Sequence, residues 1–169
     1  MLRLSRCAYH SEGGREFVGT RPPPCYKFDG MTEVKHEADD REGVRRVLVV
    51  EDDEARCAWF RARLEGRRLD VTCDVPTALA WLAEREYEAV LLDHDLADEH
   101  YFSDAHDDER TGYAVARWLA DNPDAQRDAL IVIHSLNYTG ARRMLDALRD
   151  AGRDAEHIPF HYLQMGLRI

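Results

Sequence analysis

The sequence predicts an α/β domain in three layers, with a doubly wound, parallel, five-stranded sheet between two layers of helices. Short and wholly apolar segments recur along residues 44–160, and such runs are typical of strands buried on both faces of a sheet. Segments with apolar residues at helical spacing alternate with them, which indicates βαβ units. The three clearest strands each end in polar or ionisable residues.

The first half of the pattern contains three strands and two helices. Gly66 ends the first helix, whereas Asp74 caps the second, which has Pro76 in its first turn. In chain order, the expected elements are a strand at 47–50, a helix at 54–64, a strand at 69–73, the helix after Asp74, and a strand at 89–92.

The second half continues the alternation. Apolar residues at helical spacing indicate two more helices, and Gly152 closes the second of them. The expected elements are a helix at 111–119, a strand at 130–133, a helix at 138–151, and a weaker strand at 154–158.

Two segments flank the predicted domain. Residues 1–43 show no sustained periodicity and carry Gly13-Gly14 and Pro22-Pro23-Pro24, so we expect a disordered or loosely packed leader. Met31 offers an alternative start within it. Residues 161–169 are expected to form a C-terminal tail, too short for a full closing helix.

Composition limits the function classes. The chain has 169 residues and a formal net charge of −10, from 23 basic and 33 acidic residues, which argues against a broad nucleic-acid-binding surface. A phosphate-bearing ligand stays compatible, because a bound cation reverses the local field. No apolar run approaches the ~20 residues of a membrane span, and no secretory signal is present, so we expect a cytoplasmic protein.

Four short motifs at strand ends resemble the receiver domains of response regulators, over about residues 45–160. Glu51-Asp52 resembles the metal-holding acidic pair, Asp93 the phosphoacceptor, Ser135 the switch Ser or Thr, and Pro159-Phe160 the pair after strand five. The resemblance implies the flavodoxin-like receiver fold, with the strand order 2-1-3-4-5.

The acidic residues of these motifs predict a metal site. Carboxylates gathered at neighbouring strand ends repel one another unless a hard cation lies between them. We therefore expect Glu51, Asp52 and Asp93 to hold Mg²⁺ or Mn²⁺; the alternative is that they are solvated acids of an acidic protein.

Two features depart from the receiver pattern. Ile158 stands where receivers have a lysine, and no lysine follows Lys35. The link between Asp95 and Gly112 is long and rich in acids and histidines, and links of this length are usually either functional or disordered.

Two histidines follow neighbouring strands, in Asp93-His94-Asp95 and His134-Ser135-Leu136-Asn137. This pattern resembles a divergent branch, the cyclic-phosphate-processing receiver domains. The resemblance implies a metal-dependent phosphodiesterase that opens a cyclic phosphate at an RNA or nucleotide end. His94 and His134 would act as base and acid, beside Asp93 and Ser135, while Asp95 and Asn137 bind substrate.

Side-chain geometry and chemistry leave alternatives open. Alternation along a strand turns His94 and His134 away from Asp93 and Ser135 unless the chain curls there. A phosphoacceptor receiver signalling through Asp93 is one alternative, which the missing lysine disfavours. Another is a pseudo-receiver without chemistry, which binds a protein partner. Self-association into a homodimer is a separate expectation. The expected partner otherwise is a phosphate-bearing small molecule or an RNA end, with no membrane involved.

Overall fold

The fold was obtained as a computed structural model that describes residues 45–96 and 108–167. Five parallel strands form one sheet in the order β2-β1-β3-β4-β5, which confirms the predicted order and direction. The strands are β1 (Arg46–Val50), β2 (Arg68–Thr72), β3 (Ala89–Leu92), β4 (Leu130–Ile133) and β5 (Ala155–His157).

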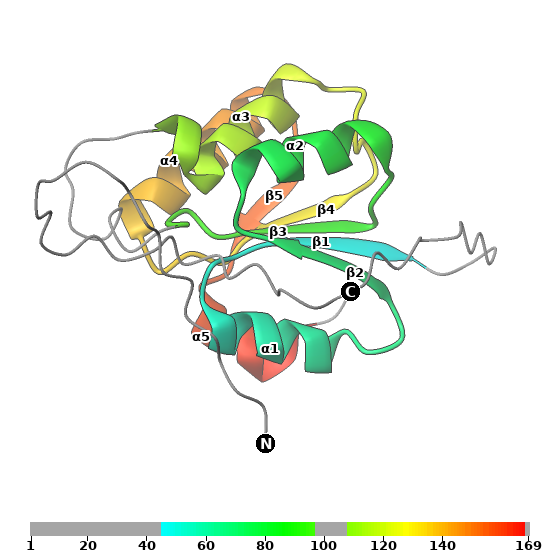
Figure 1. Cartoon of the computed structure of the whole chain (residues 1–169). Helices are drawn as coiled ribbons and strands as arrows, with labels where there is room; N and C mark the ends of the chain where they lie inside the picture. The colour runs from blue at the N-terminus through cyan, green and yellow to red at the C-terminus, as the bar shows by residue number, and fades with distance from the viewer. Residues whose placement is uncertain (1–44, 97–107, 168–169) are drawn as a thin grey trace, which may run out of the picture.

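Helices cover both faces of the sheet, so the predicted three layers are present. In Figure 1, α2, α3 and α4 lie on one face, while α1 and α5 lie on the other. The helices are α1 (Glu54–Arg63), α2 (Val75–Glu84), the 3-10 turn η2 (Asp108–Arg110), α3 (Gly112–Asp121), α4 (Tyr138–Asp150) and α5 (Phe160–Gly166).

Most helices begin at a capping side chain. Asp53 accepts a hydrogen bond from the Arg56 amide at the start of α1, and Asn137 accepts one from Gly140 at the start of α4. Asp74 and Thr111 cap α2 and α3 in the same way. These caps satisfy amides that lack partners within the helix. Since Asp53, Asp74 and Asn137 come within four residues of the ends of β1, β2 and β4, the starts of α1, α2 and α4 are held at one edge of the sheet.

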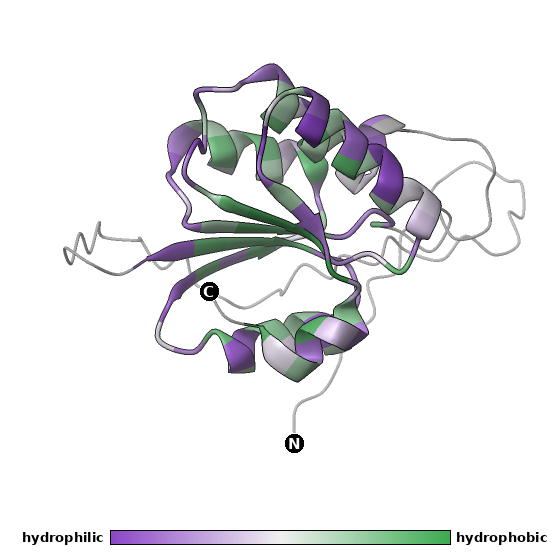
Figure 2. Cartoon of the chain, turned by 180° about the vertical axis from the view of Figure 1, so that it is seen from behind, coloured by the Kyte–Doolittle hydropathy of each residue, from purple (hydrophilic) through white to green (hydrophobic). Residues whose placement is uncertain are grey.

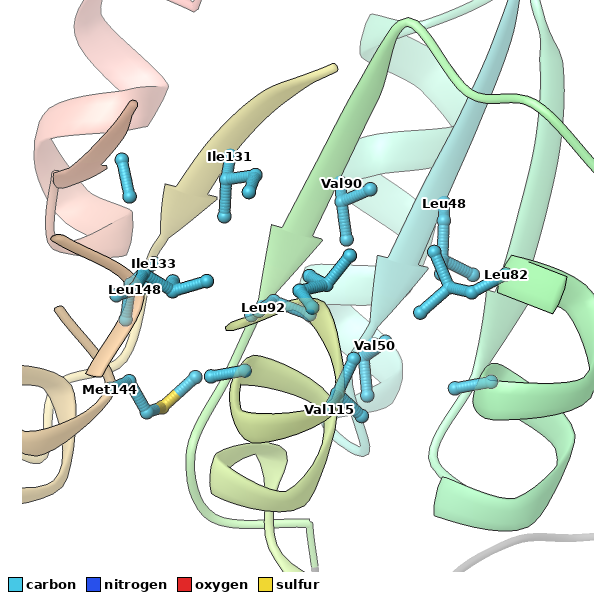
Figure 3. Packing of buried hydrophobic residues seen from close by; sticks show 14 of the residues in the cluster. Leu48, Val50, Leu82, Val90, Leu92, Val115, Ile131, Ile133, Met144 and Leu148 are labelled. Carbon is cyan, nitrogen blue, oxygen red and sulfur yellow. The ribbon is translucent and has the colours of Figure 1, made fainter. Parts of the chain in front are cut away.

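Alternation along the strands divides the apolar core into two clusters. Leu48, Val50, Leu92 and Ile133 face α2, α3 and α4, where Figure 3 shows them packed with Met144 and other helix residues. Residues in between, such as Val49, face α1 and α5 in the second cluster. Figure 2 shows the apolar character along the central strands, whereas the helices carry both apolar and polar residues.

The C-terminal segment differs from its prediction. Residues 160–166 form α5, and Leu163 and Leu167 are buried in the second core cluster. Phe160 and Leu163, three residues apart, lie on one side of this short helix, and Leu167 follows directly after it as the C-cap residue. The packed domain therefore extends to Leu167, beyond the predicted end at Phe160.

Two expectations concern other parts of the chain. The leader 1–43 and residues 97–107 of the long link lie outside the described residues. Within 45–96 and 108–167, none of the helices has the length and apolar character needed to cross a membrane.

Candidate functional site

Three carboxylates meet where β1 and β3 end. The strands are neighbours and Val50 pairs with Leu92, so the following residues, Glu51 and Asp93, lie side by side with Asp52. One oxygen from each of these acidic side chains lies within 4.8 Å of the others. A cation bound 2.0–2.6 Å from its ligands would span such a separation. The predicted meeting of the three acids is confirmed.

Burial makes this cluster electrostatically costly. Removal from water, followed by the charges of Glu51 and Asp93, raises the pKa of Asp52 to about 7. Burial also raises the pKa of Asp93, whose side chain is only 2% exposed. The buried Oδ1 of Asp52 accepts no hydrogen bond from the described residues. A buried carboxylate oxygen without a donor is unfavourable, and a bound cation would remove that penalty.

Glu51 has its two oxygens engaged on different sides. Its Oε1 accepts hydrogen bonds from the amides of Asp52 and Asp53, each at 2.9 Å. Its Oε2 lies 3.0 Å from Nε2 of His134. Because its side chain is completely buried, these contacts orient the carboxylate and keep it next to Asp93.

Arg56 joins the cluster from α1. Its guanidinium lies 3.0 Å from Asp93 Oδ2 and 3.1 Å from Glu51 Oε1, with Asp52 Oδ1 at 3.8 Å. The arginine side chain is 12% exposed. Sequence reasoning missed this residue, although its position four residues after Asp52 places it one helical turn from the acids. A positive charge thus lies among the carboxylates.

His134 points away from the mouth of the site. Its ring is fully buried and packs edge-to-face on Phe60, with centroids 5.1 Å apart, on the side covered by α1 and α5. Nε2 contacts Glu51, whereas Nδ1 has no hydrogen-bond partner among the described residues. His134 therefore supports Glu51 from within the core.

His94 points to the opposite side, toward α4. Its Nδ1 lies 2.7 Å from Asp95 Oδ1, and its ring packs against the backbone of Gly140. Nε2 is buried without a hydrogen-bond partner in the described part of the chain. Gly140 is a second residue that sequence reasoning missed, because nothing local indicates that a ring from β3 will lie against α4.

The structure thus does not bring His94 and His134 together. Their rings occupy opposite faces of the sheet. The register between β3 and β4 pairs Leu92 with Ile133, so His134 is level with Asp93 and one residue out of step with His94. The expectation that the two imidazoles converge on one substrate is wrong. A role for either histidine in catalysis stays a prediction.

Beside the acids lies a small pocket of about 40 Å³, lined by Arg56, Asp93, Asp95, Ser135, Leu136 and Asn137. The Asn137 side chain donates to both Asp95 oxygens, at 3.2 and 3.1 Å. Ser135 Oγ accepts a hydrogen bond from the Asn137 amide at 3.1 Å. A single water needs at least ~10–15 Å³, so the space suits a phosphate group or a hydrated cation better than a whole nucleotide.

Comparison with known families decides the relationship. A family described as the cyclic-phosphate processing receiver domain matches residues 47–150, more than half of the chain. The chain belongs to this family. No curated protein matches it.

Several solved structures share the fold. A response regulator from Burkholderia pseudomallei, with a phosphorylated aspartic acid, calcium ion and citrate, is 18% identical, with a TM-score of 0.50 over 73% of this chain and 66% of that one. A CheY-like receiver domain from Methanospirillum hungatei JF-1 is 17% identical, with a TM-score of 0.50 over 72% and 89%. A sensor protein from Polaromonas sp. JS666 is 24% identical, with a TM-score of 0.50 over 68% and 82%.

Directly after β5, this receiver domain has Ile158 where receivers have a lysine. Ile158 follows that strand, donates its amide to Ile133 and packs against the second core cluster. The folded site therefore has no lysine at this position, as the sequence indicated. Of the residues that line the pocket, Arg56 alone is a cation.

Proposed function

We propose that this receiver domain binds Mg²⁺ or Mn²⁺ through Glu51, Asp52 and Asp93, and processes a cyclic phosphate at an RNA or nucleotide end. The observation that carries the metal site is the buried Oδ1 of Asp52, which has no hydrogen-bond donor within the described residues and lies among two further carboxylates. Family membership supports the cyclic phosphate. The Burkholderia response regulator, whose structure holds a calcium ion, supports an oxygen-ligated divalent cation.

The reaction would be hydrolysis of a cyclic phosphodiester. Water adds to phosphorus, one P–O bond to the ribose breaks, and the leaving oxygen takes a proton. A bound divalent cation supplies Lewis-acid stabilisation of the phosphoryl oxygens in this class of reaction. The protein's own residues would orient the phosphate, through the hydroxyl of Ser135 and the side-chain amide of Asn137, which both border the pocket.

The histidines act through their neighbours in this proposal. His94 orients Asp95, to which its Nδ1 lies close, and Asp95 is the carboxylate beside the pocket that would accept a proton from water. His134 orients Glu51 in the same manner. Both are positioning residues, since neither ring lines the pocket.

A direct assay tests this function. Cyclic and linear phosphate-ended nucleotides, including 2′,3′-cyclic ones, are incubated with the protein, with and without Mg²⁺ or Mn²⁺, and the products are followed by ³¹P NMR. We expect cation-dependent opening of the cyclic phosphate, which Asp95→Asn reduces by roughly 10²–10⁴, the usual effect of losing one proton-transfer group. A protein that opens none of the cyclic substrates with either cation would contradict the proposal.

A second candidate function is a phosphoacceptor receiver. Arg56 supplies a cation at 3.0 Å from Asp93 Oδ2, so Ile158 does not leave that carboxylate without positive charge. Incubation with acetyl phosphate and Mg²⁺, followed by intact-mass measurement, distinguishes the two. Rapid and stoichiometric phosphorylation that Asp93→Asn abolishes, without turnover of cyclic phosphates, would favour signalling.

A further inference from the structure

Arg56 shares its acidic partners with the proposed cation. The guanidinium contacts Asp93 Oδ2 at 3.0 Å and Glu51 Oε1 at 3.1 Å. The two carboxylate side chains are 2% and 0% exposed. Buried carboxylates need a nearby positive charge, and Arg56 provides one.

The oxygens offered to a cation are largely engaged. Glu51 Oε1 receives two backbone amides besides Arg56, and Oε2 lies against His134. Asp93 Oδ1 accepts the His94 amide at 2.7 Å, while Oδ2 pairs with Arg56. A divalent cation held by Glu51 and Asp93 would lie a few ångströms from the guanidinium, where like charges repel strongly in a weakly polar interior. Arg56 and the cation therefore compete for the same carboxylates.

If a cation displaces the Arg56 guanidinium from the carboxylates, the neighbouring pocket can receive it. Arg56 already lines the pocket that Ser135 and Asn137 border. Its side chain is long and starts in the first turn of α1, so a change of rotamer would turn the guanidinium toward the pocket while the helix stays in place. Arginine presents a planar fork of donors that matches two phosphate oxygens. No other pocket-lining residue carries positive charge.

We propose that Arg56 is the resident counter-ion of the cation-free site and becomes the phosphate-binding residue once a divalent cation occupies Glu51 and Asp93. The inference rests on the proposed function, since it presumes the cation site. It assigns to Arg56 on α1 the cationic contact that Ile158, after β5, cannot make. It requires two effects of opposite sign when Arg56 loses its charge: tighter cation binding and weaker phosphate binding.

Calorimetric titrations test both effects. Mn²⁺ is titrated into the wild type, Arg56→Gln and Arg56→Lys, and inorganic phosphate is then titrated into each Mn²⁺-loaded protein. Arg61→Gln is the matched control, because Arg61 is exposed on the same helix. We expect Arg56→Gln to bind Mn²⁺ about tenfold more tightly, as a competing charge is removed, and phosphate at least ~10-fold more weakly. Arg61→Gln should match the wild type in both titrations.

The outcomes separate this inference from the function on which it rests. If neither the wild type nor any variant binds Mn²⁺, the proposed cation site is wrong and the inference falls with it. If the wild type binds Mn²⁺ and phosphate but Arg56→Gln fails to change both affinities in the stated directions, only the role of Arg56 is wrong.

Arg56→Lys keeps the experiment decisive if Arg56→Gln does not fold. Lysine retains the competing charge but lacks the planar fork. Mn²⁺ affinity should then stay within about threefold of the wild type, while phosphate binding weakens by about tenfold. Equal phosphate affinity in Arg56→Lys and the wild type would overturn the inference.

Discussion

The ring of His94 lies so close to Gly140 that a Cβ on the glycine would be 2.4 Å from the ring carbons Cγ and Cδ2. The start of α4 therefore packs directly on a side chain from the end of β3. Gly112 makes a similar approach, since its Cβ would lie 1.8 Å from the backbone oxygen of Asp93. These contacts place α3 and α4 against the strand end that carries Asp93 and Asp95.

We expect Gly140→Ala to destabilise the protein. Alanine favours a helix interior over glycine by ~1 kcal/mol, but here the methyl group would overlap the His94 ring, and such overpacking costs ~1–3 kcal/mol. Urea unfolding measures the change. The double variant Gly140→Ala with His94→Ala should recover stability, and Gly166→Ala, which meets nothing within 4 Å, should not destabilise the protein. An unaltered unfolding midpoint in Gly140→Ala would show that the ring can move freely.

Cation binding should raise thermal stability. A ligand that binds the folded state alone contributes ~2.7 kcal/mol at a hundredfold excess over its dissociation constant. We expect Mn²⁺ and Mg²⁺ to raise the melting temperature of the wild type, and Asp52→Asn or Asp93→Asn to abolish the effect. Glu54→Gln removes an exposed neighbouring acid and should retain it. Melting curves that neither cation shifts would contradict the metal site.

Cation affinity should increase with pH around neutrality. Burial, with the charges of Glu51 and Asp93, raises the pKa of Asp52 to about 7 in the cation-free protein, so a proton must leave before Asp52 can act as a ligand. The apparent Mn²⁺ affinity should therefore rise from pH 6 to pH 8 and level off above the pKa. Calorimetry in buffers of different ionisation enthalpy would also detect the released proton. An affinity that does not change over this range would refute the role of Asp52.

Asp70 should contribute to stability against acid, away from the site. Burial alone would raise its pKa, but hydrogen bonds from Tyr87, Arg46 and Arg85 lower it below the ordinary 3.8. A carboxylate with a lower pKa when folded stabilises the protein above the unfolded pKa, and this contribution is lost as pH falls through the folded value.

The variant Asp70→Asn tests this contribution. Urea unfolding at pH 7 should show a less stable variant, and the difference from wild type should shrink as the pH falls below about 4. Asp121→Asn removes an exposed acid that pairs with Arg117 and should have little effect. A difference between Asp70→Asn and the wild type that stays constant with pH would contradict the assignment.

Local patterns were enough to predict most of the fold. The apolar runs at 47–50, 89–92 and 130–133 are the central strands of the sheet, because a strand buried on both faces must be apolar throughout. The short helix α5 was missed, since a seven-residue helix with two buried residues, Phe160 and Leu163, carries little periodic signal.

The sequence by itself determined that Glu51, Asp52 and Asp93 meet, because adjacent parallel strands bring the residues that follow them to one edge. Only the tertiary structure decided that Arg56 lies among these acids and that His94 and His134 face opposite sides. Strand ends and helix caps follow from neighbours along the chain. The direction in which a side chain points depends on how whole elements pack. So does the presence of a distant backbone segment, such as Gly140, that leaves room for it.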